Sequence, residues 1–101
     1  MTNARFHYRG PANIDGVDFP NVTLAEDFRE PGQELRSWSG TTSFPGAAAP
    51  AGFSANIGGD GAVTVRLPDG REGRLLVTAT SFNGQTWTLD LAGTGTPPAL
   101  P

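Results

Sequence analysis

The sequence predicts an all-β protein, a small antiparallel β-barrel of six to eight strands, with an open β-sandwich as the alternative. Short apolar runs alternate with polar residues at a period of two, and no segment keeps a 3.6-residue period over a helical length. Turn residues separate these runs at intervals of about eight to twelve residues, which is typical of barrels and sandwiches. A barrel is favoured over a sandwich because closure removes exposed strand edges.

The length of 101 residues allows one hydrophobic core, and we expect a single β domain over 1–95 followed by a flexible, proline-rich tail over 96–101. The absence of cysteine excludes a disulfide framework, a thiolate metal site and a cysteine nucleophile. No apolar run reaches the length of a membrane span, and the N-terminus lacks the apolar core of a signal peptide. We therefore expect a cytoplasmic protein that does not interact with membranes.

The first expected strand covers 5–9, where Phe6 and Tyr8 alternate with polar residues. Gly10-Pro11 is expected to interrupt this strand, as proline does at bulges and edges. Asp15-Gly16 then predicts a tight hairpin turn into the next strand.

That next strand, over 17–28, changes phase in its middle. Its apolar residues stand first at odd positions, up to Phe19, and then at even positions from Val22 onwards. Because a one-residue slip moves every side chain to the other face, we place a β-bulge at Pro20-Asn21.

Further strands are expected over 35–44 and 62–67, and the stretch between them contains a mobile surface loop over 44–53. The best-specified element is a hairpin over 73–95 with Asn83-Gly84 at its turn. Leu75, Val77 and Ala79 share one phase in the first arm of this hairpin, and period-two alternation predicts that Trp87, Leu89 and Leu91 of the second arm face inward.

The net charge is −3, and acidic residues concentrate in one segment. Six carboxylates lie between Asp15 and Glu34, against a single arginine. This segment is interpreted either as a solvated acidic face or as a docking face for a basic protein partner. Candidate partner-binding residues are Asp15, Asp18, Asp27, Glu30 and Glu34. Nucleic acid is not an expected partner, because binding phosphates requires clustered cations.

Three residues could serve as polar groups in a pocket. Glu26 shares the phase of Val22 and Leu24, so its carboxylate is predicted to face the apolar interior, where burial would raise its pKa. A strand end that has already left the core, or a pairing arginine, would explain Glu26 equally well. His7 and Tyr8 are the other catalytic candidates, and His7 is expected at the surface, opposite Tyr8.

Trp38 and Trp87 are candidate ligand-binding residues, because an exposed indole can stack on a sugar or a planar metabolite, although both also suit a core. Metal ligation would require His7 together with Asp15 and Asp18, at spacings that match no known pattern, so no metal site is expected. No cofactor-binding motif is present in the sequence.

Two short pieces of the chain carry a resemblance to a known family. Tyr8-Arg9-Gly10-Pro11-Ala12 with the turn that follows, and Gly93-Thr94-Gly95-Thr96-Pro97-Pro98, resemble the start and finish of an actinobacterial small β family of unknown function. Members of that family occur alone or attached to flavin-dependent monooxygenases. The resemblance implies an accessory or binding role, and it implies no catalytic residues.

The sequence therefore leads to two hypotheses about function. The first is a non-catalytic binding or accessory module for a protein partner or a small apolar molecule. The alternative is a small β-barrel enzyme, of isomerase or cyclase type, with a carboxylate in an enclosed pocket. Function is expected near 20–34 or in the 44–53 loop, because the C-terminal hairpin is mainly structural.

Overall fold

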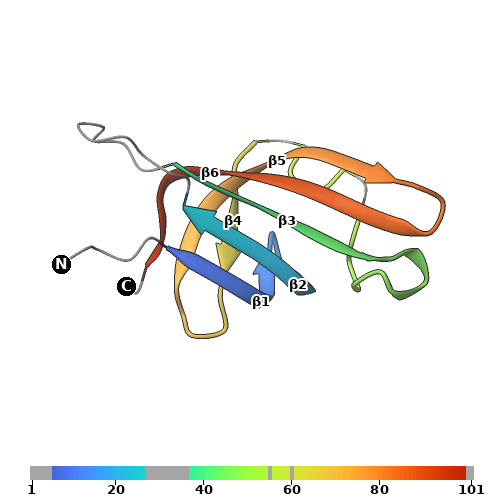
Figure 1. Cartoon of the computed structure of the whole chain (residues 1–101), viewed down its shortest axis with the longest axis horizontal. Helices are drawn as coiled ribbons and strands as arrows, with labels where there is room; N and C mark the ends of the chain where they lie inside the picture. The colour runs from blue at the N-terminus through green and yellow to red at the C-terminus, as the bar shows by residue number, and fades with distance from the viewer. Residues whose placement is uncertain (1–5, 27–36, 55, 60, 100–101) are drawn as a thin grey trace.

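Six antiparallel strands close into a barrel in the order β1-β2-β3-β6-β5-β4, as predicted (Figure 1). The structure is a computed structural model that describes residues 6–26, 37–54, 56–59 and 61–99. The elements are β1 (His7–Ile14), β2 (Val17–Glu26), β3 (Trp38–Pro45), a short 3₁₀ helix η1 (Gly46–Ala48), β4 (Val63–Arg66), β5 (Glu72–Phe82) and β6 (Thr86–Ala99).

The turn between β1 and β2 forms at Asp15-Gly16, as predicted. Asp15 has a φ of 53° and Gly16 a φ of 83°, the two positive values that a type I′ hairpin turn requires. The Asn13 side chain stabilises the turn, because its Oδ1 accepts a hydrogen bond from the Gly16 amide at 3.0 Å. The residue types in the turn therefore fix the register in which β1 and β2 begin to pair.

The β-bulge predicted at Pro20-Asn21 is also present. Gly10 pairs with Val22 and Ala12 pairs with Phe19, so Pro20 and Asn21 together oppose the single residue Pro11. The inward phase changes there as expected, and the buried residues of β2 are Val17, Phe19, Val22, Leu24 and Glu26. At Gly10-Pro11 the β1–β2 pairing shifts register, but the first strand does not end there as expected, because β1 continues to Ile14.

β5 and β6 form the expected C-terminal hairpin. Oδ1 of Asn83 accepts hydrogen bonds from the amides of Gln85 and Thr86, at 2.9 and 2.7 Å, and so closes the turn. β6 does not stop at residue 95, where the domain was expected to end. It runs to Ala99, which pairs with Glu72 of β5, so the strand includes part of the segment expected to be a tail.

The segment that follows β3 is anchored to the core by an aromatic side chain. After η1, the half-buried Phe53 ring contacts Phe44, Trp87 and Phe19, with centroid distances of 4.9, 5.2 and 6.2 Å. The sequence predicts a mobile surface loop over 44–53. The structure instead places Phe53 across the end of the barrel that lies nearest the β5–β6 turn.

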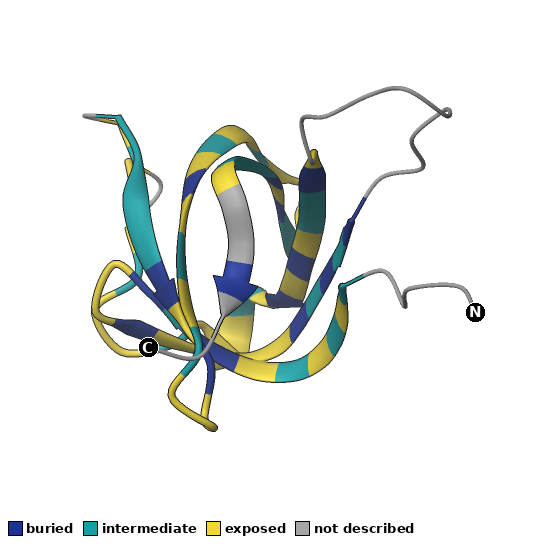
Figure 2. Cartoon of the chain, turned by 90° about the vertical axis from the view of Figure 1, so that its left-hand side faces the viewer, coloured by how far each residue is buried: buried dark blue, intermediate teal, exposed yellow. Residues whose placement is uncertain are grey.

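Buried and exposed residues alternate along the strands, so that one apolar core fills the barrel (Figure 2). Trp38 is its largest fully buried side chain, and its indole ring lies so close to Gly93 that a β-carbon there would overlap the ring. The fully buried side chains around it include Phe19, Ile14, Leu24, Leu67, Leu75, Leu89, Val22 and Val65.

Candidate functional site

The barrel closes at a short seam between β1 and β4. Only two residue pairs join these strands, Asn13 with Arg66 and Ile14 with Val65. In this register the next positions would set Ala12 opposite Leu67 and then Pro11 opposite Pro68. Proline has no amide hydrogen, so two opposed prolines cannot extend the hydrogen-bonded ladder. The strands therefore stop pairing at this point.

A tight turn after β4 holds its end in place beside β1. The Leu67 amide donates to the carbonyl of Arg71 at 2.8 Å, and the Gly70 amide donates to the carbonyl of Leu67 at 3.0 Å. This turn keeps the Leu67 side chain buried in the core and leaves Pro68 exposed. Asp69 completes the turn by accepting a hydrogen bond from the Arg71 amide, which is the main reason why the pKa of Asp69 lies below its ordinary value.

Arg71 extends from this turn across β1. Its Nε lies 2.7 Å from Asp69 Oδ2, and its guanidinium sits 5.7 Å from the ring centroid of Phe6 and 5.8 Å from that of Tyr8. These cation–π contacts tie the β4–β5 turn to the start of β1. The seam is thus held by pairing at one end and by Arg71 at the other.

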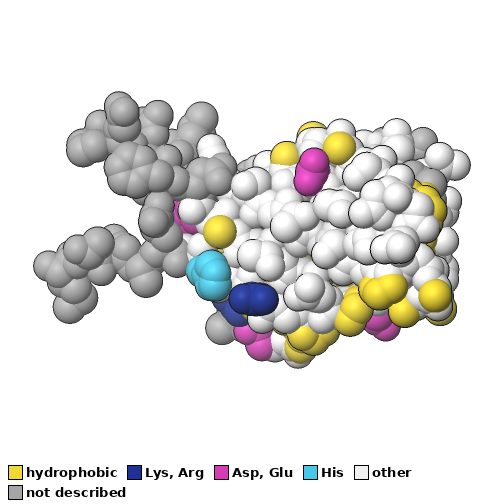
Figure 3. Space-filling view, turned by 45° about the vertical axis from the view of Figure 1, so that its right-hand side comes forward, with side chains coloured by type: hydrophobic (Ala, Val, Ile, Leu, Met, Phe, Trp, Pro, Cys, Tyr) yellow, Lys and Arg dark blue, Asp and Glu magenta, His cyan; other side chains and the backbone are white. Residues whose placement is uncertain are grey.

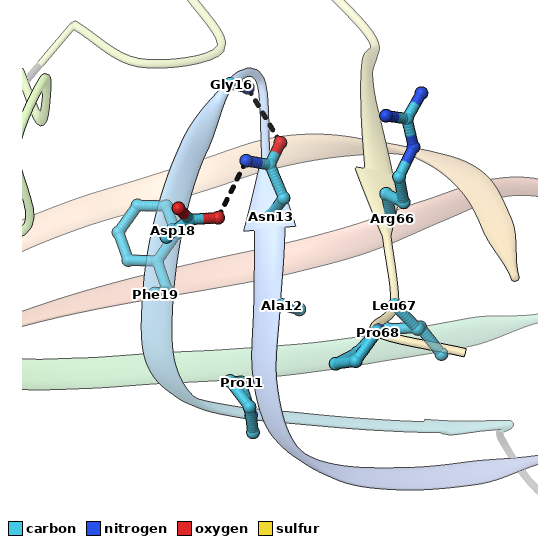
Figure 4. Close-up of a pocket in the computed structure, with 9 residues that line it drawn as sticks. All are labelled: Pro11, Ala12, Asn13, Gly16, Asp18, Phe19, Arg66, Leu67 and Pro68. Atoms are coloured by element: carbon cyan, nitrogen blue, oxygen red, sulfur yellow. Dashed lines mark hydrogen bonds between the residues drawn. The ribbon is translucent and has the colours of Figure 1, made fainter. Parts of the chain in front are cut away.

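A hollow of about 580 Å³ lies where the two strands stop pairing (Figure 4). We call it the seam hollow, and its lining residues are Pro11, Ala12, Asn13, Gly16, Asp18, Phe19, Arg66, Leu67 and Pro68. Ala12, Phe19 and Leu67 belong to the buried core and form its apolar floor. Asn13, Asp18 and Arg66 form a polar rim.

The rim residues together with the neighbouring Asp15 and Glu72 carry a net negative charge. Asp18 Oδ1 accepts a hydrogen bond from Asn13 Nδ2 at 2.9 Å (Figure 4). Arg66 Nε lies 2.7 Å from Glu72 Oε2, so these two charges offset each other. A second hollow of about 270 Å³ adjoins the first, and it is lined by Asp15 and Thr64 besides Asn13, Gly16 and Arg66. The two aspartates therefore dominate the local field.

Two of the five acidic residues expected to bind a partner are brought together at this site. Asp15 and Asp18 are both exposed, Asp15 in the β1–β2 turn and Asp18 at the start of β2. Asp27, Glu30 and Glu34 lie outside the described residues. The acidic segment thus contributes to the seam hollow through its first two members.

The three catalytic candidates lie near the start of β1, and none of them lines the seam hollow, although Tyr8 contacts its lining residue Pro11. Glu26 is buried, as predicted, and its Oε1 accepts a hydrogen bond from the Phe6 amide at 3.1 Å. The Tyr8 hydroxyl donates to the carbonyl of Pro11, and His7 is exposed, as expected. The contacts of Glu26 and Tyr8 with backbone groups give both side chains a structural role.

The two tryptophans occupy different environments. Trp38 is 2% exposed, so it belongs to the core rather than to a surface on which a ligand could stack. Trp87 is half-buried between Phe53 and Phe82, with centroid distances of 5.2 and 4.7 Å. Neither residue lines the seam hollow.

In the described part of the chain, no group of three or more histidine, cysteine, aspartate or glutamate side chains could hold a metal ion. The same residues include no helix with the length and apolarity needed to cross a membrane.

Sequence analysis missed most of the residues that form the seam hollow. The sequence predicts a break at Gly10-Pro11 and a strand that ends at residue 67, but nothing in it shows that Pro11 and Pro68 face each other. That relation depends on the β1–β4 register, which joins segments far apart in the chain. The available signal was a proline close to the end of each of two expected strands, because proline occurs where a strand edge is not paired.

Comparisons with known proteins were made for family models, curated proteins and solved structures. No match was found in any of the three. The function is therefore argued from the geometry of the site.

Proposed function

We propose that this protein is a non-catalytic binding module, and that the seam hollow receives an apolar side chain of a protein partner beside a basic residue. The observation that carries the proposal is the hollow itself, which combines a floor of core residues with an acidic rim. The hollow has a volume of about 580 Å³ and is open to solvent.

The floor supplies the apolar part of the recognition. Ala12, Phe19 and Leu67 line the floor, and the exposed Pro11 and Pro68 offer rigid apolar walls beside it. A leucine-sized or aromatic side chain placed there would leave water without requiring the barrel to rearrange. Burial of such a side chain contributes about 2 kcal/mol.

The rim supplies the electrostatic part. Asp18 lines the seam hollow and Asp15 lines the adjoining one. Arg66, which lines both hollows, is already paired with Glu72. An approaching cation therefore meets a favourable field, which raises the association rate and selects against acidic partners. A ligand that touches both the floor and Asp15 must extend over the surface. A protein segment fits this requirement better than a small apolar molecule.

The resemblance of the two ends of the chain to a small actinobacterial β family agrees with this proposal. That resemblance implies an accessory or binding role rather than a catalytic one. Pro11 and Ala12, which belong to the first matching piece, both line the seam hollow.

The proposal predicts that Asp18 contributes to the binding of basic, apolar peptides. A fluorescently labelled peptide of alternating arginine and leucine is titrated with the protein, and its anisotropy is followed. We expect saturable binding that Asp18→Asn weakens by roughly threefold to tenfold, because a rim charge contributes about 1 kcal/mol. Asparagine can keep the hydrogen bond from Asn13, so the change removes only charge.

Asp90→Asn is the matched control for this prediction, because Asp90 is also exposed but lies on β6, away from the hollow. It should leave the affinity unchanged. The same peptide with glutamate in place of arginine should not bind. Equal affinities for the two peptides, or equal losses in the two variants, would contradict the proposal.

The enzymatic alternative depends on a carboxylate in an enclosed pocket. Glu26 is buried, but it lies at the end of the β1–β2 hairpin opposite to the seam hollow, and its Oε1 is bonded to the Phe6 amide. Glu26 lines neither of the two hollows described above. We therefore do not put this alternative forward as a second function.

A further inference from the structure

One half of the molecule is uncharged. Residues 37–59 and 75–89 contain no aspartate, glutamate, arginine, lysine or histidine. In the fold these segments are neighbours, because β3 pairs with β6 and β6 pairs with the second part of β5. In Figure 3 this end of the molecule is mostly white, the colour of backbone and of side chains that are neither charged nor hydrophobic, and hydrophobic side chains gather towards the lower right beside an acidic side chain. Charged surface normally keeps small domains apart.

A strand edge crosses this uncharged half. β5 pairs with β4 only from Glu72 to Leu75, and the remaining residues of the strand pair only with β6 among the described residues. Gly58 packs against Val77, where an added β-carbon would lie 2.7 Å from Val77 Cγ2. The open part of the edge is therefore 79–82, next to the turn into β6.

This edge lacks the features that keep strands from pairing with other chains. The sequence Ala-Thr-Ser-Phe contains no lysine, no proline and no inward-pointing charge, which are the usual protections of an exposed edge. The bulge between Val77 and Ala79 lies before this segment, not within it. The backbone groups on the outer side of 79–82 are available for a further strand.

The two exposed large hydrophobic residues of the described chain also belong to β5. Leu76 is 38% exposed and Phe82 is 47% exposed. The Phe82 ring packs against Trp87 at a centroid distance of 4.7 Å and stands close to Gly46 of η1. Phe82 therefore continues the aromatic cluster of the core onto the surface, directly beside the open edge.

We propose that the open edge of β5, residues 79–82, pairs antiparallel with the same edge of a second copy of this chain and forms a two-fold symmetric dimer. An antiparallel edge is self-complementary, because a two-fold axis brings its donors opposite its own acceptors. Identical surfaces also bring identical charges together, and residues 79–82 with their partners on β6 carry one charged side chain, Asp90, which lies opposite Ala79 at the end of the edge away from Phe82.

The dimer would join the two β5 strands into one continuous sheet. Each Phe82 would then be covered by the partner copy near the axis, which removes exposed apolar surface. An association of this edge with itself occupies the edge of both copies, so it closes at two copies and does not continue into a fibre. The seam hollow involves β1, β2 and β4, so this inference stands independently of the proposed binding function.

The test compares the oligomeric state of two matched variants by sedimentation velocity over a range of concentrations. Ser81 on β5 and Ser43 on β3 are both exposed, and both pair with Thr88 of β6, one from each side. Ser81→Lys places a charge on the edge, and Ser43→Lys places the same charge two strands away. We expect wild type and Ser43→Lys to dimerise alike, and Ser81→Lys to dissociate at least about tenfold more readily.

Amide hydrogen exchange supplies the second measurement. In the wild type, amides within 79–82 should become more protected as the protein concentration rises, and in Ser81→Lys they should not. Thermal unfolding of both variants shows whether each remains folded. A wild type that stays monomeric at millimolar concentration, a larger assembly, or a dimer that Ser81→Lys leaves intact would each overturn the proposal.

Discussion

Two prolines decide where this barrel opens. Pro11 and Pro68 would face each other if the β1–β4 ladder continued by two more positions beyond Asn13 and Arg66. Neither residue can donate a backbone hydrogen bond, and both lie exposed at the edge of the hollow. The hollow therefore forms because two prolines lack the amide hydrogens that would extend the β1–β4 ladder. Its negative charge comes from Asp18 at its rim and Asp15 beside it.

Gly93 of β6 leaves the space that the buried Trp38 side chain at the start of β3 occupies. Trp38 lies in the same row of the sheet as Gly93, and its indole occupies the space that a side chain there would need. The backbone of Gly93 does not have a positive φ. The requirement for glycine at this position is therefore one of space rather than backbone conformation.

We predict that Gly93→Ala lowers the free energy of unfolding by about 3 kcal/mol, because the added methyl group overpacks the core against Trp38. Urea unfolding followed by tryptophan fluorescence measures this change. Gly16→Asn is the control, since no atom lies within 4 Å of an added β-carbon there and asparagine tolerates a positive φ. If Gly93→Ala cost no more than Gly16→Asn, the described packing of Trp38 would be wrong.

Among the structural elements, the segment after β3 covers one end of the barrel core. Its η1 turn carries exposed alanines, whereas Phe53 reaches the core and contacts aromatic rings from β2, β3 and β6. Composition alone suggested mobility, because alanine, glycine and proline dominate the segment. The segment is nevertheless ordered, because the burial of the Phe53 ring offsets the conformational entropy that the loop loses.

We predict that Phe53→Ala destabilises the protein by about 2 kcal/mol, below the usual loss for a fully buried phenylalanine, because the side chain is only half-buried. Thermal unfolding checks the loss, and limited proteolysis should show faster cleavage within 46–54. Ala48→Ser changes an exposed residue of the same segment and should have no effect on either measurement. Equal behaviour of the two variants would show that Phe53 does not anchor the loop.

Elements whose cause is local could be predicted from the sequence. The Asp15-Gly16 turn follows from residues that accept a positive φ, and the bulge at Pro20-Asn21 follows from the change of hydrophobic phase along one strand. The continuation of β6 to Ala99 could not be predicted in this way. That continuation depends on the pairing of Ala99 with Glu72, which a proline-rich sequence does not indicate.

The candidate site could be predicted only in part, for the same reason. Asp15 and Asp18 were identified because charge is visible along the chain. Leu67 and Pro68 were not identified as site residues, because their position beside Ala12 and Pro11 depends on how the barrel closes. Residues that meet only through tertiary register leave no periodic signal in one sequence.

In the whole molecule, the proposed partner-binding site and the proposed dimer interface lie in different halves. The charged half contains the seam hollow, where β1 and β4 part, and the uncharged half contains the open edge of β5. A dimer through β5 would leave both hollows accessible, because their lining residues come from β1, β2, β4 and the residues next to them. Each dimer would then offer two equal binding sites, which can raise the avidity for a partner with repeated segments.

Nuclear magnetic resonance locates the surface of the protein to which the peptide binds. Amide chemical shifts of the isotope-labelled protein are recorded while the arginine–leucine peptide is added. We expect the largest shift changes at Ala12, Asn13, Asp18 and Leu67, around the seam hollow, while the shifts of Thr41 and Thr88 stay unchanged. If the peptide bound without shift changes at the hollow, or with changes centred on the start of β1 around Glu26, the seam hollow would not be the binding site.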